Sequence, residues 1–135
     1  RIPIFNVPYH AKLLGEESEA YMGLADFHQY HPSKEAIHES DLVLMIGGRL
    51  DNQMNFGNPP FFTTDQTLVC VNGSHEELEY NQAADETLLA DPGAFFDALS
   101  QISMTWADWF VLQRERRQKW DLFYRFLMVR ILYFL

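Results

Sequence analysis

Asp41-Leu42-Val43-Leu44-Met45-Ile46-Gly47-Gly48-Arg49-Leu50-Asp51 carries the strongest structural signal in the chain. Five consecutive apolar residues follow an acidic residue and end at a pair of glycines. A half-exposed strand alternates polar and apolar residues, whereas an unbroken apolar run of this length predicts a strand that is buried on both faces. We therefore expect an α/β domain with a parallel strand that ends at Gly47-Gly48.

The residues at the carboxyl end of this strand are candidates for ligand binding. Glycines adopt the backbone angles of a tight turn and leave room for another group to approach the main chain. In open α/β sheets, ligands bind outside the carboxyl ends of the strands. Gly47, Gly48 and Arg49 are therefore candidate site residues, although a Gly-Gly pair also closes strands that bind nothing.

The rest of the chain alternates between strand and helix patterns. Strands are predicted near residues 2–7, 42–46, 67–71 and 86–90, and helices near 33–39, 75–80, 92–101 and 105–120. Residues 9–31 carry few periodic signals and predict mostly loop, with one helical turn at most. Alternation of this kind indicates a parallel sheet with right-handed crossovers and helices on its faces.

Several helix starts are marked in the sequence. Ser74 and Asp91 are suitable N-cap residues, and Pro32 and Pro92 suit the first helical turn. The last predicted helix of the sheet region carries an apolar stripe at helical spacing that we expect to face the sheet. The residues of that stripe are Phe95, Phe96, Leu99 and Ile102.

Composition and charge limit the class of protein. Hydrophobic residues make up 47% of the 135 residues, which is typical of one globular domain with a core of its own. The net charge of −9 argues against a nucleic-acid surface, which needs clustered Lys and Arg. Cys70 is the single cysteine and lies in an apolar run, so it is expected to be buried and inert. The absence of a disulfide framework suits a reducing, cytoplasmic compartment.

The charge also changes along the chain. Residues 1–100 hold 4 basic and 16 acidic side chains, whereas residues 101–135 hold 6 basic and 3 acidic ones. We therefore divide the chain into a domain at 1–103 and a linker helix with an apolar tail at 104–135. The tail at 122–135 is too short and too charged to span a bilayer, which takes roughly 20 apolar residues. Its exposed apolar residues predict self-association.

Five segments, in order, resemble the central domain of thiamine-diphosphate-dependent enzymes. The stretch at 41–51 is similar to the "aDlvl-iGaR-d" motif of that family. The remaining matches are Ile2-Pro3-Ile4-Phe5 with a "giPV" strand, Tyr21-Met22-Gly23 and His28 with an "lGm-G-hG" loop, Val71 to Leu78 with an "iDiDp-El" turn, and Leu89-Ala90-Asp91 with "gDa". Residues 56–61 resemble the acetolactate-synthase-like and 2-hydroxyacyl-CoA-lyase-like members. The resemblance covers residues 1 to about 102.

The resemblance implies a Rossmann-like domain of a larger enzyme, and it implies that the first strand and helix of that domain are missing here. In the family, thiamine diphosphate and Mg²⁺ are bound by the two other domains, which are the expected partners within a homo-oligomer, a dimer or tetramer. Their catalytic glutamate and Gly-Asp-Gly motif are not found in this sequence. We therefore expect no catalytic residue, no metal ligand and no thiamine diphosphate binding in this chain alone.

An adenine cofactor is the ligand that the resemblance leaves open. In some members of the family the central domain carries FAD or ADP, and in others it carries nothing. The corresponding residues here are Gly47, Gly48, Arg49, Asn72, Gly23 and His28. Asn72 and Ser74 replace the two aspartates of the family turn, where an acid would hold a ribose. Arg49 is the one cation well placed to pair with a phosphate.

Other chemistries have weaker support. His28 and His31 are three residues apart, but no third metal ligand lies at an obvious spacing. Neither a Gly-x-Ser-x-Gly nucleophile elbow nor a Gly-x-Gly-x-x-Gly fingerprint occurs. Two function classes remain at this point. One is the non-catalytic central domain of a carboligase, decarboxylase or lyase, and the other is a stand-alone nucleotide-binding or interaction module that shares only the fold.

Overall fold

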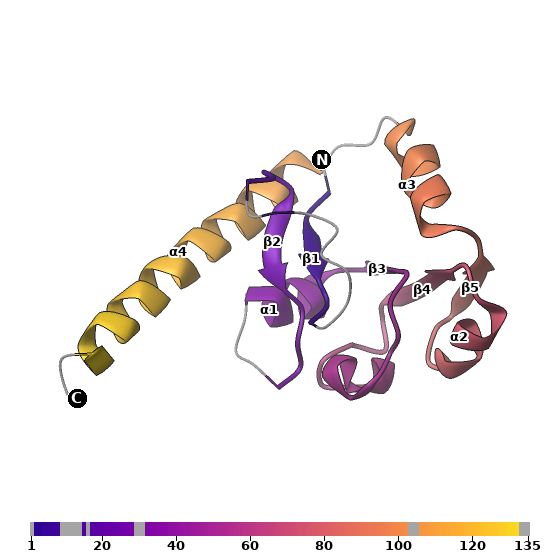
Figure 1. The fold of residues 1–135 in the computed structure, drawn as a ribbon, viewed down its shortest axis with the longest axis horizontal. Coiled ribbons are helices and arrows are strands. Elements are labelled where there is room, and N and C mark those ends of the chain that lie inside the picture. The colour runs from indigo at the N-terminus through magenta and orange to yellow at the C-terminus, as the bar shows by residue number, and fades with distance from the viewer. Residues whose placement is uncertain (1, 9–14, 16, 29–31, 103–105, 133–135) are drawn as a thin grey trace.

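A computed structural model describes residues 2–8, 15, 17–28, 32–102 and 106–132, with backbone alone for 124–132. It contains five strands, all paired in parallel, in two sheets (Figure 1). The first sheet holds β1 (Ile4–Asn6) and β2 (Tyr21–Leu24), and the second holds β3 (Leu42–Ile46), β4 (Thr67–Asn72) and β5 (Glu86–Leu89) in the order β3-β4-β5. The α/β class with parallel strands is confirmed.

The predicted parallel pairing of residues 42–46 with 67–71 is also confirmed. The register runs from Leu42 opposite Thr67 to Ile46 opposite Val71. The strand at 2–7, which we expected in the same sheet, pairs only with β2 in the described chain.

The burial expected for the stretch at 42–46 is wrong. Leu42 is 45% exposed, and Met45 is the single fully buried residue of β3. The physical reason is position, because β3 is an edge strand and β4 is the central one. The three most deeply buried strand positions of this sheet are accordingly on β4, at Leu68, Cys70 and Val71.

The loop expected at 9–31 is wrong in part, because residues 21–24 form β2. Tyr21 and Met22 are 7% and 1% exposed, so tertiary packing stabilises this short strand. Gly23 has φ +114°, and the register between β1 and β2 shifts around it. The glycine that indicated a loop therefore makes an irregular strand instead.

The α-helices begin close to where they were expected. They are α1 (Pro32–Glu39), α2 (His75–Tyr80), α3 (Pro92–Ser100) and α4 (Ala107–Leu132). The 3-10 segment η1 (Asn52–Gly57) was not predicted from the sequence. Ser74 caps α2 by accepting from the Glu77 N–H, and Asp91 caps α3 by accepting from the Ala94 N–H at 2.8 Å. In Figure 1, α2 and α3 lie on opposite sides of the second sheet. The apolar stripe on α3 is only half-buried, and Ile102 lies beyond the helix and is 54% exposed.

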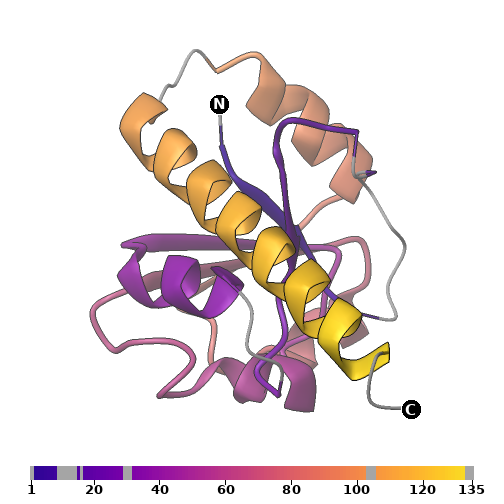
Figure 2. The same ribbon diagram turned by 90° about the vertical axis from the view of Figure 1, so that its left-hand side faces the viewer.

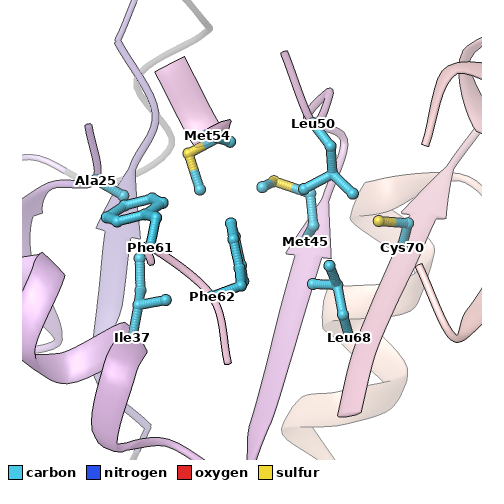
Figure 3. Close-up of a cluster of buried hydrophobic side chains, with 9 residues drawn as sticks. All are labelled: Ala25, Ile37, Met45, Leu50, Met54, Phe61, Phe62, Leu68 and Cys70. Atoms are coloured by element: carbon cyan, nitrogen blue, oxygen red, sulfur yellow. The ribbon is translucent and has the colours of Figure 1, made fainter. Parts of the chain in front are cut away.

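The main core lies between the two sheets (Figure 3). Phe61 and Phe62, from the loop after η1, sit edge to face with ring centroids 5.3 Å apart. Gly57 closes η1 with φ +75°, and a Cβ there would lie 2.6 Å from Ala83 Cβ. The buried cluster comprises Ala25, Ile37, Met45, Leu50, Met54, Phe61, Phe62, Leu68 and Cys70.

The carboxyl-terminal helix packs across the first sheet. It begins at Ala107 and continues to Leu132, well past the end predicted at residue 120. Figures 1 and 2 show α4 lying over α1 and β2, with its carboxyl end projecting past the other elements. Phe110 and Gln113 are buried on its inner side. Within the described residues, no helix is long and apolar enough to cross a membrane.

Candidate functional site

Two of the predicted site segments meet at the carboxyl end of the second sheet. The Gly47 N–H donates to the Val71 carbonyl at 2.8 Å, so Gly47 lies beside the strand that leads to Asn72. Gly47 has φ +71°, a region that favours glycine. A Cβ on Gly47 would lie 3.4 Å from Cγ of Pro92, the first residue of α3. The start of α3 therefore covers this strand end.

The second glycine is closely packed by its own strand. A Cβ on Gly48 would meet the Met45 sulfur at 2.5 Å. Asn81, which is 1% exposed, follows α2 and holds the same turn. Its carboxamide oxygen accepts from the Leu50 N–H at 2.7 Å, and its Nδ2 donates to the Gly48 carbonyl at 3.4 Å. The glycine pair thus serves a tight turn against a buried amide.

The Arg49 side chain is engaged by α2. Its Nε donates to Oε2 of Glu77 at 2.8 Å, and its Nη2 donates to Oε1 of the same carboxylate. The guanidinium also lies over the Tyr80 ring, 4.3 Å from its centroid. The hydrogen bond to Glu77 raises the pKa of Arg49. Because Nε and Nη2 already bind a carboxylate, a phosphate at this place would compete with Glu77 for that side of the guanidinium.

Asn72 is also engaged locally. Its Oδ1 accepts from the Ser74 N–H at 3.0 Å, and its backbone carbonyl accepts from the Ala90 N–H at 3.0 Å. Asn72 therefore stabilises the turn into α2, because its carboxamide oxygen binds a backbone N–H of that turn.

Gly23 and His28 lie at a different place, on β2 and on the loop that follows it. Nothing lies within 4 Å of a Cβ built on Gly23, so no cradle surrounds this glycine. The His28 backbone N–H donates to Asp26 Oδ1 at 2.8 Å. The His28 ring Nε2 lies 3.0 Å from the Asn52 carbonyl oxygen, which ties the loop to η1. His28 therefore makes local structural contacts with Asp26 and Asn52.

A hollow of about 290 Å³ lies away from the strand ends, between α1 and the loop after η1. None of the six candidate residues lines it. Its walls are Phe27, Lys34, Glu35, His38, Pro60 and Phe61.

The residues that sequence reasoning missed are Glu77, Tyr80 and Asn81. They occupy positions i, i+3 and i+4, so they share one side of α2 and its end. This spacing, in the helix that follows the neighbouring parallel strand, is the signal that would have indicated contacts with the turn after β3.

Metal-ligating side chains and the single thiol are also candidate site groups. Among them, no group of three or more His, Cys, Asp or Glu side chains is placed to hold a metal ion. Burial raises the pKa of the Cys70 thiol to about 11, so the thiol is protonated at neutral pH and is a poor nucleophile.

The comparison with known families agrees with the fold. The sequence profile of "Thiamine pyrophosphate enzyme, central domain" matches residues 1–99. The chain therefore belongs to the thiamine pyrophosphate enzyme family and forms its central domain. No curated protein is significantly similar to the chain.

Membership of this family implies thiamine diphosphate in the parent enzyme, but the residues present here do not fit that group. No Gly-Asp-Gly sequence occurs in the 135 residues. The acids at the strand ends are committed to protein groups, because Glu77 binds Arg49 and Asp91 caps α3. No step of thiamine chemistry can be assigned to these residues.

Proposed function

We propose that this chain is a non-catalytic, structural central domain of a thiamine-diphosphate-dependent transferase or lyase. The structural role rests on one observation. Arg49, in the turn after β3, binds the Glu77 carboxylate of the same chain instead of an open ligand site. Residues 56–61 favour an acetolactate-synthase-like or 2-hydroxyacyl-CoA-lyase-like parent that acts on 2-keto acids or 2-hydroxyacyl compounds.

The partners that follow from this proposal are the two other domains of the parent enzyme. Those domains would bind thiamine diphosphate and Mg²⁺, within a cytoplasmic homo-oligomer, a dimer or tetramer. The single, buried Cys70 fits a reducing compartment. In this arrangement, residues 1–103 are the domain and the helix that follows is an appendage of it.

A second candidate is binding of an adenine cofactor, FAD or ADP, across Gly47, Gly48, Arg49 and Asn72. The observation that favours it is the place of these residues at adjacent carboxyl ends of parallel strands. The Glu77 carboxylate already occupies the Nε and Nη2 side of Arg49 and would compete with a phosphate there. Removing that carboxylate should therefore improve binding of the cofactor.

Calorimetric titration of the chain with each ligand separates these proposals. For the structural role we expect no binding of thiamine diphosphate with Mg²⁺, and no binding of FAD or ADP. Micromolar binding of thiamine diphosphate would contradict the first proposal. For the second, FAD or ADP should bind, Arg49→Ala should weaken binding roughly tenfold, and Glu77→Gln should tighten it. Binding that is unchanged in both variants would place the nucleotide elsewhere.

A further inference from the structure

The outer side of α4 carries an apolar face that the rest of the described chain does not cover. Its large apolar residues are exposed: Val111 (53%), Leu112 (38%), Leu122 (68%) and Phe123 (53%). In Figure 2, α4 lies in front of the other elements with this outer side open. Trp120 lies 5.9 Å from Phe123 between ring centroids, so the Phe123 ring has a neighbour within its own helix.

The exposed residues recur at the spacing of a helix–helix seam. One line of exposed residues runs along α4 at steps of three, four and three positions. Its members are Leu112, Glu115, Lys119 and Leu122. Steps of three and four place side chains on one side of an α-helix, which is the pattern of coiled-coil seams. Val111 and Phe123 flank the seam at its two ends.

We propose that this face binds the same face of a second copy of the chain, with the two α4 helices antiparallel about a two-fold axis beside Arg117. That axis pairs Leu112 with Leu122 of the second copy and Glu115 with Lys119, while Val111 and Phe123 lie on opposite edges of the seam. Each contact occurs twice, as a two-fold symmetric interface requires. Apolar residues therefore meet apolar residues at both ends, and opposite charges meet at the centre.

Charge selects the antiparallel arrangement. Parallel helices in register place Glu115 opposite Glu115 and Lys119 opposite Lys119, and facing like charges oppose association. In the antiparallel arrangement the same residues form two complementary pairs. Among the ion pairs between described residues, none uses Glu115 or Lys119, so both side chains are available to a second copy.

The length of the exposed face limits the surface area that two α4 helices can bury against each other. From Val111 to Phe123 the helix rises about 18 Å at 1.5 Å per residue. A single helix pair of this length buries less surface than a standard interface of about 1,600 Å². We therefore expect a weak dimer, which is best measured at high protein concentration. The α4 helix lies outside residues 1–99, so dimerisation through it does not depend on the proposed function.

A charge swap in the full chain tests the pairing. We expect sedimentation velocity to show a concentration-dependent dimer for the wild type. Glu115→Lys and Lys119→Glu should each weaken dimerisation by about tenfold or more, because each places like charges face to face. The double variant restores opposite charges and should dimerise within about threefold of the wild type. Glu76→Lys, the same charge change on the exposed side of α2, is the matched control and should leave the dimer unchanged.

Other outcomes overturn the proposal. A wild-type chain that stays monomeric at several hundred micromolar has no such interface. If Glu76→Lys and Glu115→Lys change self-association equally, then the association depends on net charge or on the apolar tail and not on the proposed pairing. Circular dichroism checks that each variant is folded. If a reversal disturbs α4, Glu115→Gln and Lys119→Gln remove the charges singly and should each give a smaller loss.

Cysteine pairing tests the direction of the helices. A mixture of Leu112→Cys and Leu122→Cys chains should form a mixed disulfide under mild oxidation, because the antiparallel seam places these positions face to face. Each variant alone should cross-link much more slowly. Native Cys70 is buried, and burial raises the pKa of its thiol to about 11, so it contributes little background. Rapid pairing of Leu112→Cys chains with one another would instead show parallel helices.

Discussion

The domain body, residues 2–102, and the α4 helix are held in place by different kinds of interaction. The body is held by apolar burial, with Phe62 at 2% exposed and Met54 at 2%. Buried polar groups such as Asn81 bind backbone atoms of the body. Burial of this kind is not weakened by the screening of charges, so we expect the body to keep its packing at salt concentrations that screen ion pairs.

The α4 helix buries Phe110 and Gln113 on its inner side, and arginines of the same helix reach the acidic body. Arg116 donates to both carboxylate oxygens of Glu39 at 2.9 and 2.8 Å, and it lies 3.4 Å from Glu35. Arg117 donates to the Tyr21 carbonyl and lies 4.8 Å from the centroid of its ring. Exposed ion pairs contribute little stability each and are screened by salt. We therefore expect α4 to detach before the body unfolds, and the predictions below test this difference.

The largest expected effect is loss of core packing in the body. Phe62→Ala removes a buried ring and should lower the free energy of unfolding by about 3–5 kcal/mol. Phe56→Ala, whose side chain is 58% exposed, is the matched control and should change stability little. Urea denaturation followed by far-ultraviolet circular dichroism measures both. Equal losses in the two variants would show that the core is not located between the sheets.

A smaller effect should follow from loss of the buried amide behind Gly48. Asn81→Ala leaves the Leu50 N–H and the Gly48 carbonyl without their partner, which should cost about 1–3 kcal/mol. Gln82→Ala changes an exposed neighbour and should have almost no effect. The same denaturation measurement applies. A loss below about 0.5 kcal/mol for Asn81→Ala would mean that the turn does not depend on this amide.

The attachment of α4 should respond to Arg116→Gln and to salt, with little change in the body. The ion pairs are worth less than about 1 kcal/mol, because Glu35 and Glu39 are roughly half exposed. All three tryptophans lie at 106, 109 and 120, so tryptophan emission reports on α4. We expect a red shift in Arg116→Gln, and in the wild type at 1 M salt. Arg114→Gln removes a pair at 4.0 Å and is the weaker control.

The smallest expected effect is a pH dependence of the same attachment. The hydrogen bond from Arg116 lowers the pKa of Glu39 below its ordinary value of 4.5. A lowered pKa gives stabilisation that is present above 4.5 and is lost as the pH falls through the folded-state value. The tryptophan red shift should therefore appear below pH 4.5 while circular dichroism still reports a folded body. Glu39→Gln should lack this step, and a step that persists in the variant would assign it to another carboxylate.

The sequence alone determined the order of the main elements and the family. An unbroken apolar run closed by Gly47-Gly48 specifies a strand and its end, because these signals act over a few neighbouring residues. The helix starts at Ser74 and Asp91 were predictable for the same reason, since a cap binds a backbone N–H three residues away. The profile match at 1–99 agrees with the motifs that were recognised in order.

The tertiary structure decided which of these segments is central and what the polar residues bind. Leu42 is exposed because β3 lies at an edge, and residues 21–24 form a strand because β1, α1 and α4 surround them. Arg49 faces Glu77 and Tyr80, 28 and 31 positions further along the chain, so no local pattern marks its partners. Burial, strand order and side-chain pairing depend on contacts between distant segments, and only the folded chain brings those segments together.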